Sequence, residues 1–396
     1  MIYSLAYWIL LPMSIILPYT SQIAATSLFG PRSDILEGRK LVYSLVLFRH
    51  GHRYPDNNDD LPPGIPAGDW NIGGEELTQK GTQQCYFLGQ FLHERYKNLL
   101  KNHYDYKEVY VRSTDTDRTI SSALAVLAGL FPPKGFEIWN PNLLWQPVPV
   151  HTVELTKDPL LKPSEYDCKP IDKWRKAHDD PMWRQLEKRP EYQRIIRMFS
   201  KISPKYKQLS KIKKLYAPIL AMLWKRARLP SWFNNATYDA ISKVYQLNYR
   251  FKFDDEIEHK LAGGLLTGDI LTRLKSKAAK NMNEKLRIYS SHMGTVIPLL
   301  QNLDLYNGIA PPYATALIFE LHHDRKSGHH FVEIFYRNET SSPTAFLYRL
   351  SLPRCPTSQC TIQRFERALT GKYFLTVKEL NDSCDIETSS SSDEDK

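Results

Sequence analysis

The 396-residue sequence is missing the signatures of two large hydrolase classes. It contains no Gly-rich Walker loop, so nucleotide hydrolysis by that route is not supported. It also contains no Gly-x-Ser-x-Gly elbow of the kind that presents a nucleophilic serine. After the N-terminal segment, no stretch is long and apolar enough to cross a membrane. Any catalytic site therefore has to be sought in other residues.

Charge is missing from the N-terminal segment, because residues 1–31 include no Asp, Glu, Lys or Arg. Ile2–Leu17 is mostly apolar, and the small residues of Ser21–Ala25 follow it. The pattern predicts a signal peptide over residues 1–25, although the usual positive charge at its start is absent. The rival interpretation is a membrane anchor, which we disfavour because prolines and a polar stretch shorten the apolar run.

The cysteines and the glycosylation sequons both bear on the compartment. An odd cysteine count predicts one free thiol, and Cys85 is the best candidate because it lies on an apolar helical stripe. Together with the signal peptide, the sequons favour secretion, with the lysosomal lumen as the alternative, and argue against nucleic acid as a partner. The five cysteines are Cys85, Cys168, Cys355, Cys360 and Cys384, and the three sequons begin at Asn235, Asn338 and Asn381.

Short apolar runs alternate with helical patterns at both ends of the chain. This alternation predicts an α/β fold with a mostly parallel central sheet flanked by helices and interrupted by a smaller helical cap domain. The predicted strands are 41–48, 108–111, 287–290, and a hairpin of 315–321 with 331–336; the predicted helices include 75–100 and 119–130. The predicted domains are 38–155 and 281–384 for the core, 156–280 for the cap, and 385–396 for a disordered Ser/acidic tail.

The predicted cap is strongly basic. Between Tyr192 and Tyr238 it carries eleven Lys or Arg and no Asp or Glu, and the whole chain has a formal net charge of +10. A solvated helical surface is the simpler interpretation. The alternative is a polyanion contact through the basic cap, for example with a sulfated glycan.

Three predicted strands end in a cationic or imidazole residue. Arg49-His50 follows the first strand, Arg112 ends the second, and His292 follows a later one. Ligands of open α/β sheets bind outside the carboxyl ends of the strands, so these side chains are expected to converge in one cleft. The sequence Arg-His-Gly-x-Arg-x-Pro at residues 49–55 is the most specific signal, because its glycine permits a tight turn and two arginines flank an imidazole.

These residue types fit phosphoryl transfer. Arginine forks match phosphate oxygens bidentately, and Arg49, Arg53 and Arg112 supply three of them. A neutral imidazole among the arginines, here His50, can attack phosphorus and form a covalent phosphohistidine. The neighbouring guanidinium groups hold the pKa of that imidazole down and keep it nucleophilic.

Both motifs resemble those of the histidine acid phosphatases. Arg49–Pro55 matches that family's Arg-His-Gly-x-Arg-x-Pro signature, and Arg112–Thr119 resembles its second arginine motif. The similarity to prostatic, lysosomal and venom acid phosphatases runs from about Lys40 to Cys384. The resemblance implies an α/β core with a smaller helical cap and a cleft between them, and it implies hydrolysis of phosphate monoesters without a metal or organic cofactor.

The resemblance also implies individual roles. His50 would be the phosphorylated nucleophile and His292 a second catalytic side chain. Relatives of this family dimerise, so the aromatic stretch near Trp145 becomes a candidate homodimer contact. The implied phosphate ligands are Arg49, Arg53, Arg112 and His292, and the implied disulfides are Cys168–Cys384 and Cys355–Cys360.

Two positions depart from the family pattern. His52 stands where Asp often follows the glycine, and Met293 stands where a carboxyl protonates the leaving oxygen. A thioether cannot donate that proton, and general acid catalysis is worth about 10² to 10⁴-fold. We therefore expect slow hydrolysis of alkyl phosphates and a smaller defect with aryl phosphates. His52 as a substitute donor is a weaker hypothesis.

Two further interpretations stay open at this point. Met293 also fits a catalytically poor or inactive protein that binds a phosphorylated ligand without turning it over. The paired histidines His322-His323 and His329-His330 could suggest a metal site, but they flank a predicted hairpin turn. We interpret them as solvated hairpin histidines and predict no metal.

Overall fold

The computed structural model describes residues 38–55, 62–64, 74–170, 181–251, 256–356 and 359–390. The predicted signal peptide therefore lies outside the described residues, as does the end of the predicted tail. Within these ranges, no helix combines the length and apolarity that a membrane span requires. The strands are β1 (Arg39–Arg49), β2 (Val109–Ser113), β3 (Leu286–Ser291), β4 (Ala316–Asp324), β5 (His330–Arg337) and β6 (Tyr348–Leu350).

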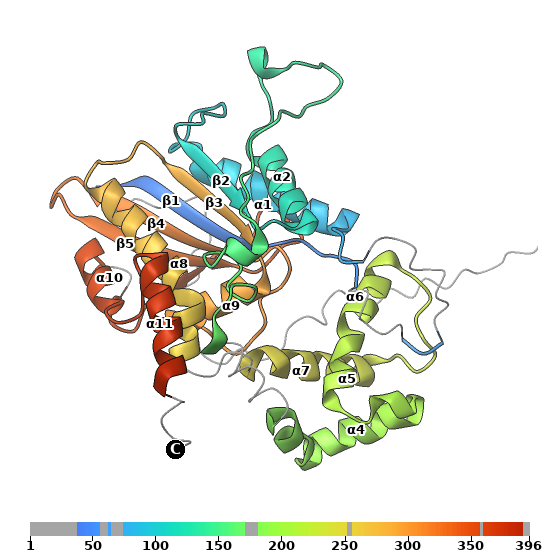
Figure 1. The fold of residues 1–396 in the computed structure, drawn as a ribbon. Helices are drawn as coiled ribbons and strands as arrows, with labels where there is room; N and C mark the ends of the chain where they lie inside the picture. Colours follow the sequence, from blue (N-terminus) through green and yellow to red (C-terminus); the bar gives the residue numbers. More distant parts are fainter. Residues whose placement is uncertain are drawn as a thin grey trace, which may run out of the picture.

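Helices cover both faces of the sheet, and a run of helices occupies the sequence between β2 and β3 (Figure 1). The α-helices are α1 (Gln79–Tyr96), α2 (Asp117–Leu130), α4 (Pro190–Ile202), α5 (Leu209–Ile212), α6 (Tyr216–Lys225), α7 (Asn235–Phe251), α8 (Glu256–Ala278), α9 (Met293–Asn302), α10 (Ile362–Ala368) and α11 (Val377–Ser390). Short 3₁₀ helices are η2 (Gly135–Glu137), η3 (Leu155–Lys157), η4 (Pro204–Tyr206) and η5 (Lys213–Leu215).

The strands form one mixed sheet in the order β2-β3-β1-β4-β5-β6. β3 pairs parallel with both β1 and β2, whereas β4, β5 and β6 join the other edge as antiparallel neighbours. Phe48 and Ser113 both pair with Ser290, so the carboxyl ends of the three parallel strands lie level with one another. The predicted α/β class and the predicted hairpin are confirmed. The sheet is mixed rather than mostly parallel, because β4, β5 and β6 pair antiparallel, and its parallel half positions the site.

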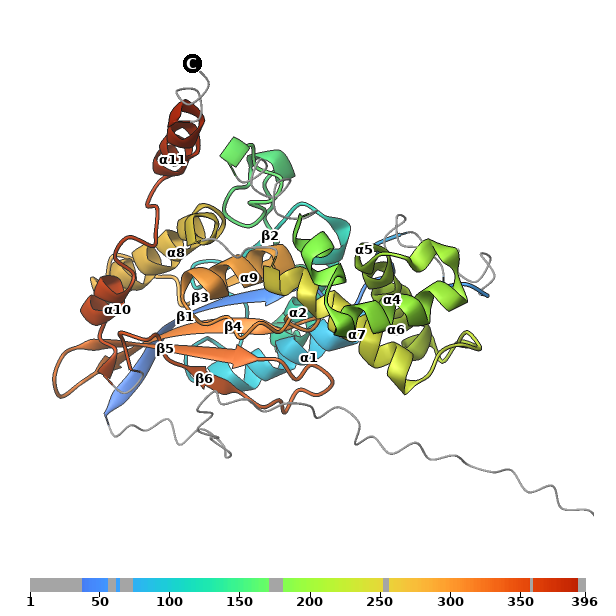
Figure 2. The ribbon, with the colours of Figure 1, turned by 90° about the horizontal axis from the view of Figure 1, so that it is seen from below.

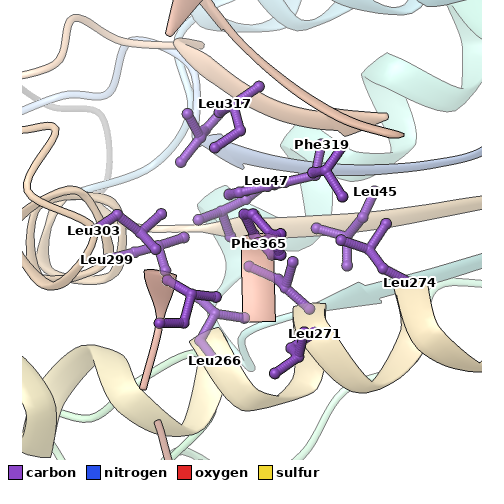
Figure 3. Close-up of a cluster of buried hydrophobic side chains, with 14 of the residues drawn as sticks. Leu45, Leu47, Leu266, Leu271, Leu274, Leu299, Leu303, Leu317, Phe319 and Phe365 are labelled. Atoms are coloured by element: carbon purple, nitrogen blue, oxygen red, sulfur yellow. The ribbon is translucent and has the colours of Figure 1, made fainter. Parts of the chain in front are cut away.

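Alternating side chains of β1 supply both hydrophobic layers. Leu45 and Leu47 face a layer built from α8, α9 and α10, while Val46 and Phe48 face α1 and α2. Figure 2 shows these two sets of helices on opposite faces of the sheet, and Figure 3 shows leucines of α8 and α9 packed against β1 and β4. A central strand that is buried on both faces has apolar residues at successive positions, which explains the apolar run at the first predicted strand.

The loop after β1 is pressed against the start of α1. A Cβ atom added to Gly51 would lie 2.3 Å from the carbonyl oxygen of Gly81, and one added to Gly81 would lie 2.1 Å from the carbonyl oxygen of His52. Thr78 caps α1 by accepting from the Gly81 amide. Only glycine fits these two positions, so the loop that carries the first motif is held rigidly by α1.

Helices α4 to α7 form a group beside the sheet in Figure 1 and share an apolar core of their own, and we refer to this group as the cap. That core includes Trp183, Phe199, Ile219 and Val244. The sequence-based boundary at residue 280 placed α8 in the cap, but the leucines of α8 pack against the sheet instead. An apolar helical pattern looks the same whether the helix packs within the cap or against the sheet, so it does not show to which of them α8 belongs. Most of the basic side chains between Tyr192 and Tyr238 are exposed, as expected of a solvated surface.

Two disulfides are present, Cys168–Cys384 and Cys355–Cys360, as the resemblance implied. The first closes a loop of 216 residues, and chain-entropy arguments assign such a cross-link about 5 kcal/mol of stabilisation. Cys85 is free and buried, and burial raises the pKa of its thiol to about 12, so it is an apolar residue rather than a nucleophile. The prediction of a disordered tail from residue 385 was wrong at its start, because α11 runs past the anchored Cys384 to Ser390.

Candidate active site

The carboxyl ends of β1 and β3 and the first turns of α2 and α9 surround a cavity of about 170 Å³. The described residues that line it include several cations and imidazoles and no carboxylate. The lining residues are Arg49, His50, Arg53, Arg118, Lys162, Pro163, Ser164, Tyr245, His292, Met293, Gly294 and Thr295. The structure thus brings together Arg49, His50, Arg53, His292 and Met293, which were named from the sequence.

His50 is oriented by a contact within its own loop. Its Nδ1 lies 2.8 Å from the carbonyl oxygen of Gly51. A carbonyl oxygen can only accept, so Nδ1 carries the proton of the neutral ring and Nε2 carries the free lone pair. Burial, reinforced by the charge of Arg49, holds the pKa of His50 well below its usual range. The imidazole therefore stays neutral to a lower pH than an ordinary histidine, as a nitrogen nucleophile requires.

Arg49 is fixed from two sides. Its guanidinium donates to the carbonyl oxygen of Pro311 at 2.7 Å and stacks 3.9 Å from the centre of the Tyr313 ring. Its buried Nε has no hydrogen-bond partner within the described part of the chain. A buried unsatisfied donor costs free energy unless a ligand accepts from it. This arrangement suits an oxygen-rich anion in the cavity.

Arg112 is not among the described residues that line the cavity. Its guanidinium donates to the buried carboxylate of Asp158 at 2.5 Å, and the segment around His151 pairs with its backbone. Arg118, six residues later in the same motif, lines the cavity instead. Arg118 stands in the first turn of α2, beyond the end of β2, and donates to Glu75 at 2.6 Å. A third guanidinium group, that of Arg118, thus lines the cavity, and phosphate binding by Arg112 stays a prediction.

His292 and Met293 stand where β3 passes into α9. His292 is the N-cap of α9, and its Nε2 lies 2.9 Å from the hydroxyl oxygen of Thr114. The imidazoles of His50 and His292 have ring centres 5.5 Å apart. Burial, followed by the charge of Lys162, lowers the pKa of His292 well below its usual range. Both rings therefore act in their neutral forms.

Met293 is an apolar part of the wall. Only 5% of it is exposed, and it packs with Ala262, Ile297 and Ala310. No Asp or Glu lines the cavity among the described residues, so no carboxyl takes over the proton-donating role there. Weakened general acid catalysis stays a prediction.

His52 has a packing role rather than a place in the cavity wall. It is buried, stacks on Trp224 of α6 with ring centres 3.9 Å apart, and approaches Tyr313 edge-on. Its Nδ1 lies 2.9 Å from the Thr78 hydroxyl oxygen. Burial, with the charges of Arg49 and Arg53, lowers the pKa of His52 to about 3. A ring that stays neutral above pH 4 and faces the cap is a poor candidate for the missing proton donor.

The interpretation of the hairpin histidines as solvated was wrong for His322. Only 5% of its surface is exposed, and its Nε2 lies 3.1 Å from Glu320 and 3.6 Å from Glu333. The three side chains are close enough to hold a metal ion, with all ligand atoms within 4.8 Å of one another. However, Arg95 pairs with Glu320 and Arg349 pairs with Glu333, so each carboxylate already has a cationic partner. We interpret the cluster as a buried ion-pair network of β4 and β5.

The fold and the sequence both have known counterparts. Residues 40–337 match the model of the histidine phosphatase superfamily (branch 2). The chain is 37% identical to mouse prostatic acid phosphatase over 342 residues, covering 84% of this chain and 87% of that protein. It is 36% identical to human lysosomal acid phosphatase over 340 residues, covering 83% of this chain and 77% of that protein.

Solved structures show the same fold at lower identity. The phytase of Klebsiella sp. ASR1 superposes with a TM-score of 0.66 at 17% identity, covering 85% of this chain and 96% of that chain. The phytase of Hafnia alvei, in complex with myo-inositol hexakis sulphate, gives 0.66 at 18% identity, covering 88% and 99%.

Proposed function

Since the chain belongs to the histidine phosphatase superfamily (branch 2), we propose that it is an acid phosphatase that hydrolyses phosphate monoesters through a phosphohistidine on His50. The observation that carries this proposal is the cavity itself. It contains a neutral imidazole whose proton is fixed on Nδ1, together with the guanidinium groups of Arg49, Arg53 and Arg118. Charge stabilisation by such pre-positioned cations is the main source of catalysis in phosphoryl transfer.

The proposed reaction has two steps. In the first, Nε2 of His50 attacks phosphorus, a P–N bond forms, and the bond from phosphorus to the ester oxygen breaks. In the second, water attacks the phosphohistidine, and inorganic phosphate leaves with the P–N bond broken. The ester oxygen needs a proton as it departs, and Met293 cannot supply it. We therefore propose that alkyl esters react slowly and that solvent provides the proton.

The pH profile of aryl phosphate hydrolysis tests this function. Activity that needs neutral His50 is present above its pKa and is lost as the pH falls through that pKa. An imidazole with the ordinary pKa of 6.5 would be only about 1% neutral at pH 4.5. Because the pKa of His50 is lowered, we expect turnover of 4-nitrophenyl phosphate to persist at pH 4.5. A loss of activity with a midpoint near 6.5, or no hydrolysis beyond that of a His50→Ala control, would contradict the proposal.

A second candidate function is phospho-ligand binding without turnover. Met293 and the absence of a lining carboxylate among the described residues favour it. The two functions separate cleanly, because a pure binder would retain inorganic phosphate in equilibrium dialysis and yet hydrolyse neither aryl nor alkyl esters.

The exposed basic side chains of the cap also offer a polyanion surface. Heparin retention by His50→Ala that is lost on reversal of cap charges would test that surface.

We propose that the protein follows the secretory route, to the outside of the cell or to the lysosome. The two disulfides support an oxidising compartment, and the three sequon asparagines, Asn235, Asn338 and Asn381, are all exposed. A mass decrease of the purified protein on treatment with an N-glycosidase would test the use of these sites.

We also propose a homodimer that uses the loop between α2 and the segment leading to the cap. This loop projects away from the sheet in Figure 1. It exposes large apolar side chains, with Phe136 at 89%, Leu144 at 67% and Trp139 at 59% exposure. Clustered exposed apolar side chains mark association surfaces. We expect Trp139→Glu to lower the sedimentation coefficient from that of a dimer to that of a monomer, and a monomeric wild type would refute the contact.

A further inference from the structure

The turn that carries the nucleophile is tied to the two helices behind it, α1 and α2. The Gly51 amide donates to the Ser122 hydroxyl oxygen of α2 at 3.1 Å. The following peptide group joins Gly51 to His52 and has partners at both of its ends. Its carbonyl oxygen accepts from Nδ1 of His50 at 2.8 Å, and its amide donates to Oε1 of Gln84 in α1 at 3.0 Å. The peptide that orients the nucleophile is thus held from behind by one side chain.

Gln84 is buried, and both ends of its amide are engaged. It is 4% exposed, and its Nε2 donates to the hydroxyl oxygen of Thr340 at 2.9 Å. Thr340 is also buried and lies in the segment after β5. The His52 amide can only donate, so it requires the oxygen of Gln84 and leaves the nitrogen for Thr340. The orientation of the Gln84 amide is therefore determined by its two partners.

The peptide after Gly51 needs such a partner because glycine does not fix it locally. The close approach of Gly81 requires glycine at position 51, and glycine permits many backbone conformations. A buried amide that has lost its acceptor is costly, which favours a rotation that finds another partner. That rotation would carry the Gly51 carbonyl away from His50. The ring could then hold its proton on Nε2, which removes the lone pair needed for attack on phosphorus.

The three hydrogen bonds also form a chain that runs in one direction. His50 donates to the peptide, the peptide donates to Gln84, and Gln84 donates to Thr340. Each of the two amide groups accepts at its oxygen and donates at its nitrogen, so each bond polarises the next. All of the participating side chains are buried, where this polarisation is weakly screened. The chain therefore makes the Gly51 carbonyl a stronger acceptor for the Nδ1 proton.

We propose that Gln84 is a positioning residue that keeps the proton of His50 on Nδ1 through the Gly51–His52 peptide. Gln84 is not among the described residues that line the cavity, so it acts without touching the substrate. The inference rests on the proposed function, in which Nε2 of His50 is the nucleophile. A glutamine that merely satisfied a buried amide would change folding stability and leave the tautomer as it is.

The tautomer of His50 is measured by ¹⁵N NMR of the histidine-labelled protein, with His50→Ala to assign its signals. Protonated and unprotonated ring nitrogens resonate apart. At a pH where His50 is neutral, we expect the Nδ1–H form in the wild type and the Nε2–H form as the major one in Gln84→Leu. We expect kcat for 4-nitrophenyl phosphate to fall by about fivefold or more, the worth of one neutral hydrogen bond. The inhibition constant of inorganic phosphate is expected to stay unchanged.

Matched variants separate this effect from a general disturbance. Gln83→Leu makes the same change at an exposed neighbouring position of α1 and is expected to change neither readout. Thr340→Val removes the far end of the chain and is expected to shift the tautomer in the same direction, but less, because the acceptor for the His52 amide remains. Thr340→Ser keeps the hydroxyl group and is expected to retain the wild-type tautomer. Asn338→Gln removes the sequon but not the hydroxyl, and is also expected to retain it.

The outcomes decide between positioning and mere packing. A Gln84→Leu protein with a lower melting temperature but the wild-type tautomer and kcat would overturn the inference, and so would an equal effect of Gln83→Leu. If Gln84→Leu does not fold, the comparison of Thr340→Val with Thr340→Ser decides by the same spectrum. The tautomer is read without turnover, so an inactive wild type would refute the proposed function alone, and the spectra would still decide the role of Gln84.

Discussion

Replacing His50 with Ala is expected to lower kcat for an aryl phosphate by about 10⁴-fold or more, while inorganic phosphate still binds. The imidazole supplies the nucleophile. Among the described lining residues, the other imidazole is that of His292, which is engaged with Thr114. Loss of a nucleophile typically removes most of an enzyme's rate enhancement. The three arginines remain in His50→Ala, so equilibrium dialysis with phosphate should show retained affinity.

Trapping of the intermediate gives an independent readout. Rapid acid-free denaturation of the wild type during turnover of ³²P-labelled aryl phosphate is expected to leave label on the protein, and His50→Ala is expected to leave none. His52→Ala is the matched control, because it removes the neighbouring imidazole of the same loop, which stacks on Trp224 outside the wall. We expect this control to retain labelling and to keep kcat within about tenfold of wild type, since only packing is lost. Equal loss in both variants would mean that the loop, rather than the nucleophile, had been disrupted.

Replacing Met293 with Asp is expected to raise kcat for an alkyl phosphate by about 10²-fold at acidic pH, with a smaller gain for an aryl phosphate. The new carboxyl would stand in the first turn of α9 beside His292, where the family's proton donor is expected. An acidic side chain also suits the first turn of a helix. The nearby cations favour its ionised form, so the gain is expected to shrink as the pH rises and the carboxyl loses its proton.

The Met293→Asn variant separates proton donation from the change in packing. Met293 packs against Ala262, Ile297 and Ala310, so either polar substitution is expected to lower the free energy of unfolding by about 2–4 kcal/mol. Asn has the shape of Asp but cannot act as the acid. A gain in alkyl turnover by Asp alone would assign the missing chemistry to position 293. Equal rates for the two variants would show that another group or solvent already supplies the proton.

The sequence predicted the parts of the site that lie within one short loop or directly after a strand. Arg49, His50 and Arg53 share a motif whose spacing determines their geometry, and His292 follows β3 at the same edge of the sheet. The layered fold was also predictable, because strands buried on both faces, such as β1, appear as continuous apolar runs.

What could not be predicted depended on contacts between distant segments. Arg112 and Arg118 belong to one motif, and the sequence did not indicate that Arg112 donates to Asp158, which lies 46 residues later, or that Arg118 lines the cavity. Lys162 lies in an irregular segment without periodicity, and its place in the wall depends on the bond from Thr295 to Leu161. His322 looked like a turn residue, but its two carboxylate partners come from β4 and β5 together.

The order of the strands constrains how the chain can fold as it is synthesised. β3 lies between β1 and β2 in the sheet, yet it follows both of them, and the entire cap, along the chain. From Ser113 to Ser291 is 178 residues (291 − 113), which at ordinary translation rates amounts to about 9 to 36 seconds. During that interval β3 is not yet available, so the edges of β1 and β2 with which it pairs stay uncovered. Production of this protein is therefore expected to depend on chaperones that shield those edges until β3 emerges. On the proposed secretory route, Asn235 would reach the glycosylation machinery before the core can close.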